Sequence, residues 1–210
     1  MSTTSITFRV VIPETPLGAG PAGREQTPLR MPDGPQGTSV GASPLHVLRF
    51  LAAALQAKAA VEVGTGSGET ALWLLRGMVP DGVVTSIDAD ASVHREARGT
   101  LRDAGVPASR TRLIAGRAVD LMPRLTEGGY DLVSVNIATT EYPQYLELGL
   151  RLLRPGGVIV FAGTQLAGPD TRSAMAQALR ELIREVQSDD TLVPVTLPTG
   201  PGLLAITKRI

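Results

Sequence analysis

A glycine-rich turn between two apolar segments is the part of this sequence best suited to hold a ligand. The strand-like residues 61–63 lead into three glycines, Gly64, Gly66 and Gly68, and a helical pattern follows them. Glycine lets the backbone turn sharply and approach a ligand closely, and the free N–H groups at the start of a helix favour an anionic or polar group. These residues therefore form a candidate ligand-binding loop.

An acidic residue, Asp88, ends the next predicted strand, which covers residues 83–87. A carboxylate at this place can accept hydrogen bonds from both ribose hydroxyls of a nucleoside. A glycine turn alone can serve packing only. A glycine turn that is followed by Asp88 at this distance predicts a nucleoside ligand.

The glycine spacing narrows the choice of nucleoside. The dinucleotide-binding fingerprint has its third glycine three positions after its second. Here Gly68 comes two positions after Gly66, and an acid, Glu62, precedes the turn. This pattern favours S-adenosylmethionine over a dinucleotide.

The elements that must position these residues alternate between strands and helices. We expect strands at 59–63, 83–87, 112–114, 132–135 and 158–161, and helices that end near 78 or cover 92–104, 118–125 and 142–153. Ser43 followed by Pro44 predicts the start of a further helix before the first strand. This βαβ repetition predicts a mostly parallel sheet that is covered on both faces.

The C-terminal region departs from that repetition. A predicted helix at 173–187 precedes two strand-like runs, 192–197 and 203–208, which only a short turn separates. Strands joined in this way form an antiparallel hairpin. We therefore predict an α/β, Rossmann-like class I methyltransferase fold, with a seven-stranded mostly parallel sheet, an antiparallel C-terminal hairpin and helices on both faces.

The composition excludes several classes of function. Twenty basic residues balance twenty acidic ones among 210, so the charge favours a small-molecule ligand over nucleic acid or an anionic membrane. The absence of cysteine excludes disulfides, thiolate zinc sites and a cysteine nucleophile. Residues 1–9 lack the features of a signal peptide, and no apolar run approaches the roughly 20 residues that span a bilayer. We expect a cytoplasmic protein.

Residues 1–42 are expected to form an arm before a binding domain at 43–210. The region 13–44 is dense in glycine and proline, which disfavour long helices and central strands. Before it, Thr7 to Ile12 has the composition of a short strand that could add to a sheet edge or to a partner subunit. A poorly ordered terminus is the equal alternative.

Several ordered motifs resemble the O-methyltransferase family that includes the caffeoyl-CoA and catechol methyltransferases. The resemblance covers about residues 39–208. The motifs that carry it are AVEVGTGSG at 60–68, SID at 86–88, YDLV at 130–133 and LLRPGGVIV at 152–160, with shorter matches at 104–105, 116–118, 197–198 and 202–203. The family resemblance also implies a homodimer.

The resemblance implies a set of residues that contact S-adenosylmethionine. Glu62 and the glycine loop would face the methionine part, with Thr70 near its carboxylate, and Asp88 would bind the ribose. Residues 116–118 would line the adenine, and residues 39–41 would close over the cofactor. The implied cofactor-binding set is Val40, Glu62, Gly64, Thr65, Gly66, Ser67, Gly68, Thr70, Asp88, Gly116, Arg117, Ala118 and Asn136.

The sequence departs from this family at the positions that bind a divalent metal. Aligned with the family, Asn136 stands for the first aspartate, Ala138 for a second acid and Thr139 for a lysine, while Ala162 and Gly163 stand for an Asp-Asn pair. One neutral amide cannot offset the cost of dehydrating a hard cation. We therefore expect no catalytic metal, and we expect Asn136 to contact the methionine amino group, to face the acceptor pocket or to cap the turn after its strand.

No catalytic base is evident. Thr139 and Thr140 are too weakly basic, and Glu141 is a residue that solvent could reach. The two histidines, His46 and His94, are expected on exposed helix surfaces. Two further residues of this region, Tyr142 and Tyr145, could shape an acceptor pocket, but they are more often core or surface residues at this spacing.

Two functions from different classes remain open. The first is an S-adenosylmethionine-dependent methyltransferase that acts on an oxygen of a small-molecule acceptor without a metal. The second is a noncatalytic S-adenosylmethionine-binding protein that kept the loop and lost the chemistry. A nucleotide-binding oxidoreductase is a weaker alternative, because the glycine spacing and the C-terminal hairpin count against it.

Overall fold

The computed structural model describes residues 43–168 and 172–209. Three sequence predictions lie outside these residues: the arm at 1–42, the short strand at 7–12 and the segment 39–41 with Val40. The described residues form part of one compact unit. Within them, no helix is both long and apolar enough to cross a membrane.

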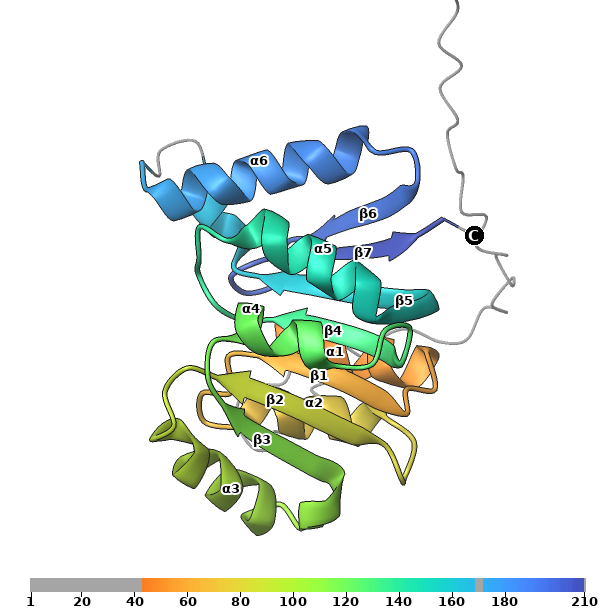
Figure 1. Ribbon diagram of the computed structural model, residues 1–210, viewed down its shortest axis with the longest axis vertical. Helices are drawn as coiled ribbons and strands as arrows, with labels where there is room; N and C mark the ends of the chain where they lie inside the picture. The colour runs from red at the N-terminus through yellow and green to blue at the C-terminus, as the bar shows by residue number, and fades with distance from the viewer. Residues whose placement is uncertain (1–42, 169–171, 210) are drawn as a thin grey trace, which may run out of the picture. The chain divides into compact units, whose positions relative to one another are not determined.

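A seven-stranded sheet forms the centre of this unit (Figure 1). The strands are β1 (Ala59–Val63), β2 (Val83–Asp88), β3 (Thr111–Ala115), β4 (Tyr130–Val135), β5 (Leu153–Ala162), β6 (Leu192–Leu197) and β7 (Leu203–Lys208). Their order is β3-β2-β1-β4-β5-β7-β6, and β1 to β5 are parallel. The central strand β1 pairs Val61 with Thr85 on one side and with Val133 on the other.

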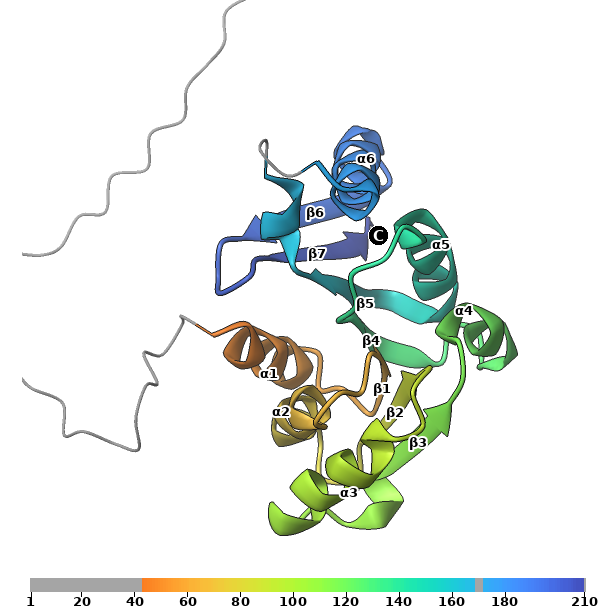
Figure 2. The same cartoon turned by 90° about the vertical axis from the view of Figure 1, so that its left-hand side faces the viewer.

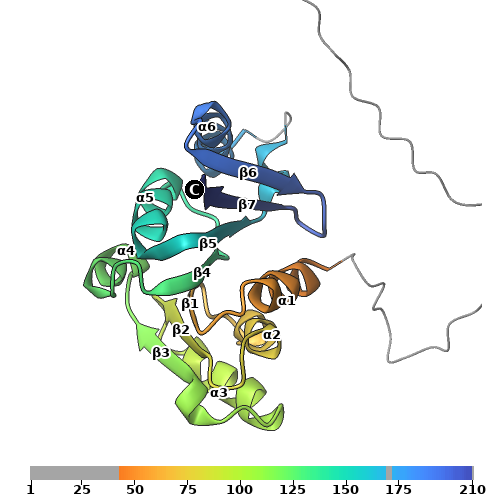
Figure 3. The ribbon, with the colours of Figure 1, turned by 90° about the vertical axis from the view of Figure 1, so that its right-hand side faces the viewer.

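The last two strands run antiparallel, and β7 lies between β5 and β6 (Figure 3). The hairpin predicted from the short turn at 198–202 is therefore confirmed, with the predicted bounds for both strands. The predicted α/β fold class, with a seven-stranded mostly parallel sheet and an antiparallel C-terminal hairpin, is therefore also confirmed.

Helices cover both faces of the sheet (Figure 2). On one face lie α1 (Pro44–Ala54), α2 (Glu69–Gly77) and α3 (Val93–Asp103), and on the other α4 (Ala118–Leu121), α5 (Tyr142–Leu152) and α6 (Ala174–Ser188). Two apolar clusters follow from this layering, because successive strand residues point to opposite faces. Thus Val61 and Ile87 pack with Leu146, whereas Ala60 and Val84 pack with Leu74.

Local sequence signals explain the start of α1 and the short length of α4. Ser43 caps α1, and its side chain accepts a hydrogen bond from the backbone N–H of Leu45. The predicted helix at 118–125 instead divides into α4 and a 3-10 turn, Met122–Arg124. Pro123 explains the division, because proline has no N–H to continue the α-helical pattern. Two other 3-10 turns, Ala108–Arg110 and Thr164–Ala167, connect strands to neighbouring elements.

The motif at 130–133 has a structural role at the edge of the sheet where the parallel strands begin. The Asp131 carboxylate accepts hydrogen bonds from the backbone N–H groups of Lys58 at 2.7 Å and Ala59 at 2.9 Å. Its other oxygen accepts from Arg154, which also donates to the Leu55 carbonyl at 3.2 Å. These contacts hold the starts of β1, β4 and β5 together, far along the strands from the glycine loop.

Candidate functional site

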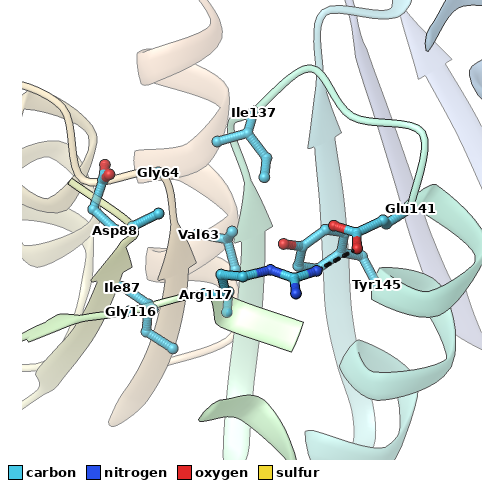
Figure 4. Close-up of a pocket in the computed structure, with 11 residues that line it drawn as sticks. Val63, Gly64, Ile87, Asp88, Gly116, Arg117, Ile137, Glu141 and Tyr145 are labelled. Atoms are coloured by element: carbon cyan, nitrogen blue, oxygen red, sulfur yellow. Dashed lines mark hydrogen bonds and ion pairs between the residues drawn. The ribbon is translucent and has the colours of Figure 1, made fainter. Parts of the chain in front are cut away.

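A cavity of about 210 Å³ opens where the first parallel strands end (Figure 4). Strands in a parallel sheet bring their carboxyl ends to one edge, where ligands bind in doubly wound folds. The lining residues come from the ends of β1 and β2, from the segments that follow β1 to β4, and from the starts of α4 and α5: Val63, Gly64, Ile87, Asp88, Ala89, Gly116, Arg117, Ala118, Ile137, Glu141 and Tyr145.

The loop after β1 has a backbone that only glycine adopts readily. The φ angles of Gly64, Gly66 and Gly68 are 90°, 47° and 82°, all in the left-handed region. A Cβ atom on Gly68 would lie 2.9 Å from the Cα atom of Ala97 on α3. The loop therefore ends pressed against α3, and Gly68 serves as the N-cap of α2.

Asp88 is hydrogen-bonded to that loop. Its Oδ2 atom accepts from the backbone N–H of Thr65 at 2.9 Å and of Gly66 at 3.3 Å, and its Oδ1 atom accepts from the N–H of Asp90 at 2.9 Å. A carboxylate has about four lone-pair positions, two on each oxygen, so Oδ1 can still accept a further hydrogen bond. The end of β2 and the glycine loop thus form one unit that faces the cavity.

A buried acid, Glu62, lies beneath the loop. Its side chain is fully buried, and Ser86 on β2 donates a hydrogen bond to its Oε2 atom. Burial raises the pKa of Glu62 to about 8, and the nearby Asp88 charge adds to the rise, although the Ser86 hydrogen bond works against it. Among the described residues no cation forms an ion pair with Glu62, so the carboxyl group stays mostly protonated at neutral pH.

Asn136 is fixed between two strands. Ser134 donates a hydrogen bond to its Oδ1 atom at 2.8 Å, and its Nδ2 atom donates to Oε1 of Glu62 at 3.4 Å. The Asn136 backbone N–H also bonds the Val63 carbonyl at 2.9 Å. Asn136 therefore forms, with Glu62 and Thr65, a polar cluster under the loop, next to where the cavity begins.

The far end of the cavity carries the remaining polar side chains. Arg117, the N-cap of α4, donates from Nη2 to Oε1 of Glu141 at 2.8 Å, and Tyr145 lies one helical turn after Glu141 on α5 (Figure 4). Burial raises the pKa of Tyr145, and the Glu141 charge raises it further, so the phenol keeps its proton. Gly116 has a φ of 145° and leads the chain from β3 into this corner.

The structure brings most of the predicted site residues together. Five line the cavity, namely Gly64, Asp88, Gly116, Arg117 and Ala118. Glu62, Thr65 and Asn136 form the polar cluster beneath it, where the Thr65 hydroxyl lies 2.6 Å from that of Ser86. Gly66 and Ser67 are exposed on the loop, and Thr70 is half-buried in the first turn of α2. Val40 lies outside the described residues.

Four cavity residues were not predicted from the sequence, namely Val63, Ile87, Ala89 and Ile137, and the places of Glu141 and Tyr145 were left open. Ile137 and Ala89 could have been found, because they follow strands that end at the same edge. Tyr145 is only 3% exposed and packs in the core as well as lining the cavity, whereas Tyr142 is fully buried and contacts Phe161.

The expectation that both histidines are exposed is wrong. His94 is 4% exposed, because it shares the inward face of α3 with Ala97 and Leu101 at spacings of three and four residues. His46 is half-buried, and its ring centroid lies 4.6 Å from that of Trp73. Neither histidine lines the cavity.

This sheet order, with a glycine loop after β1 and an acid after β2, defines a Rossmann-like domain of the methyltransferase type. Residues 30–210 match the sequence profile of the O-methyltransferase family. The chain belongs to this family.

Similar proteins agree with this assignment. A protein of Mycobacterium sp. (strain KMS) named "Putative O-methyltransferase" is 43% identical over 166 residues, which cover 77% of this chain and 76% of that protein. Among solved structures, the O-methyltransferase TomG of Streptomyces achromogenes, involved in tomaymycin synthesis and solved with S-adenosylmethionine, has a TM-score of 0.70 and 30% identity, and the match covers 77% of this chain and 78% of TomG. A Corynebacterium glutamicum protein has a TM-score of 0.72 and 29% identity, covering 78% and 79%.

Proposed function

We propose that this protein binds S-adenosylmethionine in the cavity and transfers its methyl group to an oxygen of a small-molecule acceptor without a catalytic metal. The observation that carries the proposal is that Asp88 is hydrogen-bonded to the glycine loop and that Asp88 and Gly64 line the same cavity. One ligand can therefore contact both the carboxylate and the loop backbone. The complex of the Streptomyces achromogenes relative with S-adenosylmethionine supports it.

The cavity suits the adenosine half of this cofactor. Its walls beyond Asp88 are largely apolar, with Ile87, Ala118 and Ile137 available to pack on a planar ring. The Asp88 carboxylate then accepts from the ribose hydroxyls, for which Oδ1 still has a lone-pair position.

The polar cluster suits the other half of the cofactor. S-Adenosylmethionine carries an ammonium and a sulfonium, and Glu62 is a buried acid without a cation partner among the described residues. A ligand cation placed above the loop would favour the charged form of Glu62. Asn136, bonded to Glu62, would face the same group.

The positions that hold a metal in the resembled family do not fit one here. The Asn136 side chain is engaged by Ser134 and Glu62, while Ala162 and Gly163 at the end of β5 bring no ligand side chain. No group of three histidine or acidic residues that could hold a metal occurs within residues 43–168 and 172–209. A divalent cation that prefers six or more oxygens finds too few here.

Methyl transfer can proceed on this arrangement without a metal. Bound S-adenosylmethionine would supply an activated methyl group for in-line transfer to the acceptor oxygen, with S-adenosylhomocysteine as the leaving group. The protein must align the acceptor and remove its proton. The cavity residues given above hold the cofactor, and the acceptor binds beyond it on the sulfonium side.

Calorimetric titration tests the cofactor, with S-adenosylmethionine, S-adenosylhomocysteine and NAD as ligands. We expect both sulfur compounds to bind and NAD not to bind. Binding of NAD alone would contradict the proposal. For the metal, the protein is incubated with a catechol and labelled cofactor, with magnesium or with a chelator, and strong stimulation by magnesium would overturn the metal-independent mechanism.

A noncatalytic S-adenosylmethionine-binding protein is the second candidate. It is favoured by the replacement of the three family metal ligands and by the absence of a histidine among the residues that line the cavity. Tight binding of both sulfur compounds with no methyl transfer to a panel of phenols, catechols and hydroxamates would support this candidate over the enzyme.

A further inference from the structure

We infer that Glu141 determines the base specificity of the cavity, by accepting a hydrogen bond from the exocyclic amino group of adenine. The inference rests on the proposed function, because it needs an adenosine in the cavity with its ribose at Asp88. It adds a residue whose role neither the glycine loop nor Asp88 can fulfil.

The shape of the cavity sets the direction of the ligand. Asp88 and Glu141 lie at opposite ends of the lining, and Val63 and Ile137 lie between them (Figure 4). A nucleoside with its ribose at Asp88 therefore extends its base between apolar residues toward Arg117, Glu141 and Tyr145. The edge of the base meets this polar end.

The polar end offers one strong acceptor. The adenine amino group is a donor, and arginine has only donors, so Arg117 cannot receive its hydrogen bond. The Glu141 carboxylate has about four lone-pair positions, and the hydrogen bonds found in the described residues use one of them, at Oε1, for Arg117. Oε2 of Glu141 is therefore free to accept from the base.

The Glu141 side chain is held in place before any ligand binds. Arg117 contacts it at 2.8 Å from the start of α4. The backbone of Glu141 is also fixed: its N–H donates to the Thr139 hydroxyl at 3.0 Å, and its carbonyl accepts from the N–H of Tyr145 at 3.1 Å. Its side chain is 37% exposed, so a bound base would cover it and strengthen the interaction.

The test compares two ligands that differ only at the amino group. They are S-adenosylhomocysteine and its purine riboside analogue, in which hydrogen replaces the 6-amino group. A hydrogen bond to a charged acceptor predicts that the wild-type protein binds S-adenosylhomocysteine about tenfold or more tightly than the analogue. Calorimetry gives both dissociation constants.

Variants of Glu141 then locate the acceptor. In Glu141→Ala we expect the dissociation constant of the analogue to be only about 1- to 2-fold larger than that of S-adenosylhomocysteine. In Glu141→Gln the ratio should take an intermediate value, because the neutral amide oxygen still accepts a hydrogen bond. Asp120→Asn is the matched control, because Asp120 also lies near Arg117, at 3.9 Å, but does not line the cavity. This control should keep the wild-type ratio.

The outcomes separate the inference from the proposed function. A wild-type protein that binds neither ligand overturns both. A wild-type protein that binds both ligands equally, or a Glu141→Ala variant that weakens both equally and keeps the wild-type ratio, overturns the role of Glu141 and leaves the cofactor site standing. Loss of the ratio in Asp120→Asn as well would assign the effect to Arg117 instead.

Discussion

The Oδ2 atom of Asp88 accepts a hydrogen bond from the backbone N–H of Thr65 at 2.9 Å. This contact joins the end of β2 to the loop after β1, the two features that sequence analysis selected separately. Because Gly66 also donates to the same oxygen, the loop conformation and the carboxylate position depend on each other. The loop and the carboxylate therefore form a preorganised surface at the cavity.

Replacement of this carboxylate should weaken cofactor binding. We expect Asp88→Ala to reduce the affinity for S-adenosylhomocysteine by about 1–3 kcal/mol, because the ribose hydroxyls lose a charged acceptor. Asp90→Ala is the control, since Asp90 accepts from Ser92 on the exposed surface and does not line the cavity. Calorimetry measures both, and an unchanged affinity in Asp88→Ala would mean that the ribose binds elsewhere.

The sheet was predictable because its strands carry their own signals. Residues 59–63 form β1 as predicted, since four of these five residues are apolar and the run ends just before Gly64. The buried face of α3 was not predicted, because the burial of His94 depends on how that helix lies on the sheet.

The two ends of the cavity also differ in how far they could be predicted from the sequence. Asp88 and the loop follow from a motif within one βαβ unit, which is local in sequence. Glu141 approaches Arg117 only because the segment after β4 folds back toward α4, and no residue spacing encodes that distance of 24 positions. The Asp88 end of the cavity could therefore be predicted from the sequence better than the Glu141 end.

Two neighbouring glycines should respond differently to the same substitution. A Cβ atom on Gly68 would press on the backbone of Ala97, whereas a Cβ atom on Gly66 has no neighbour within 4 Å. In both Gly66→Ala and Gly68→Ala the left-handed backbone destabilises the protein by about 1–2 kcal/mol, and the overlap in Gly68→Ala adds about 1–3 kcal/mol. Urea denaturation measures the difference, and equal stability of the two variants would show that α3 does not confine the loop.

The free energy of unfolding should depend on pH because Glu62 has different pKa values in the folded and unfolded states. Its pKa rises from 4.5 to about 8 on folding, so between these pH values the folded state binds more protons than the unfolded state. Stability from this residue is then complete below pH 4.5 and is lost as the pH rises through 8, by at most about 1.4 kcal/mol per pH unit. In Glu62→Gln this loss is absent.

The check is a series of urea denaturations of the wild-type protein and Glu62→Gln at pH 5, 6, 7 and 8. We expect the wild-type protein to lose stability relative to the variant at each step. A constant difference across the series would show that Glu62 is charged in the free protein.

Loss of the hydrogen bonds that Asp131 accepts at the start of the sheet should lower stability and leave ligand binding unchanged. Burial alone would raise the pKa of Asp131, but the hydrogen bonds from Ala59, Arg154 and Lys58 outweigh it and hold the pKa below its usual range. We expect Asp131→Ala to lower the free energy of unfolding by about 2–4 kcal/mol, because it leaves these donors without their acceptor. The affinity for S-adenosylhomocysteine should change less than about twofold, since sites this far apart act independently. A large loss of affinity with normal stability would give the motif a role in binding.

A crystal structure of the protein with S-adenosylhomocysteine tests the central claim most directly. The account predicts the ribose hydroxyls on the Asp88 carboxylate, the base between Ile137 and Ala118, and the amino acid portion above Glu62. A ligand bound at another place, or a cavity filled by protein side chains at saturating ligand, would contradict it.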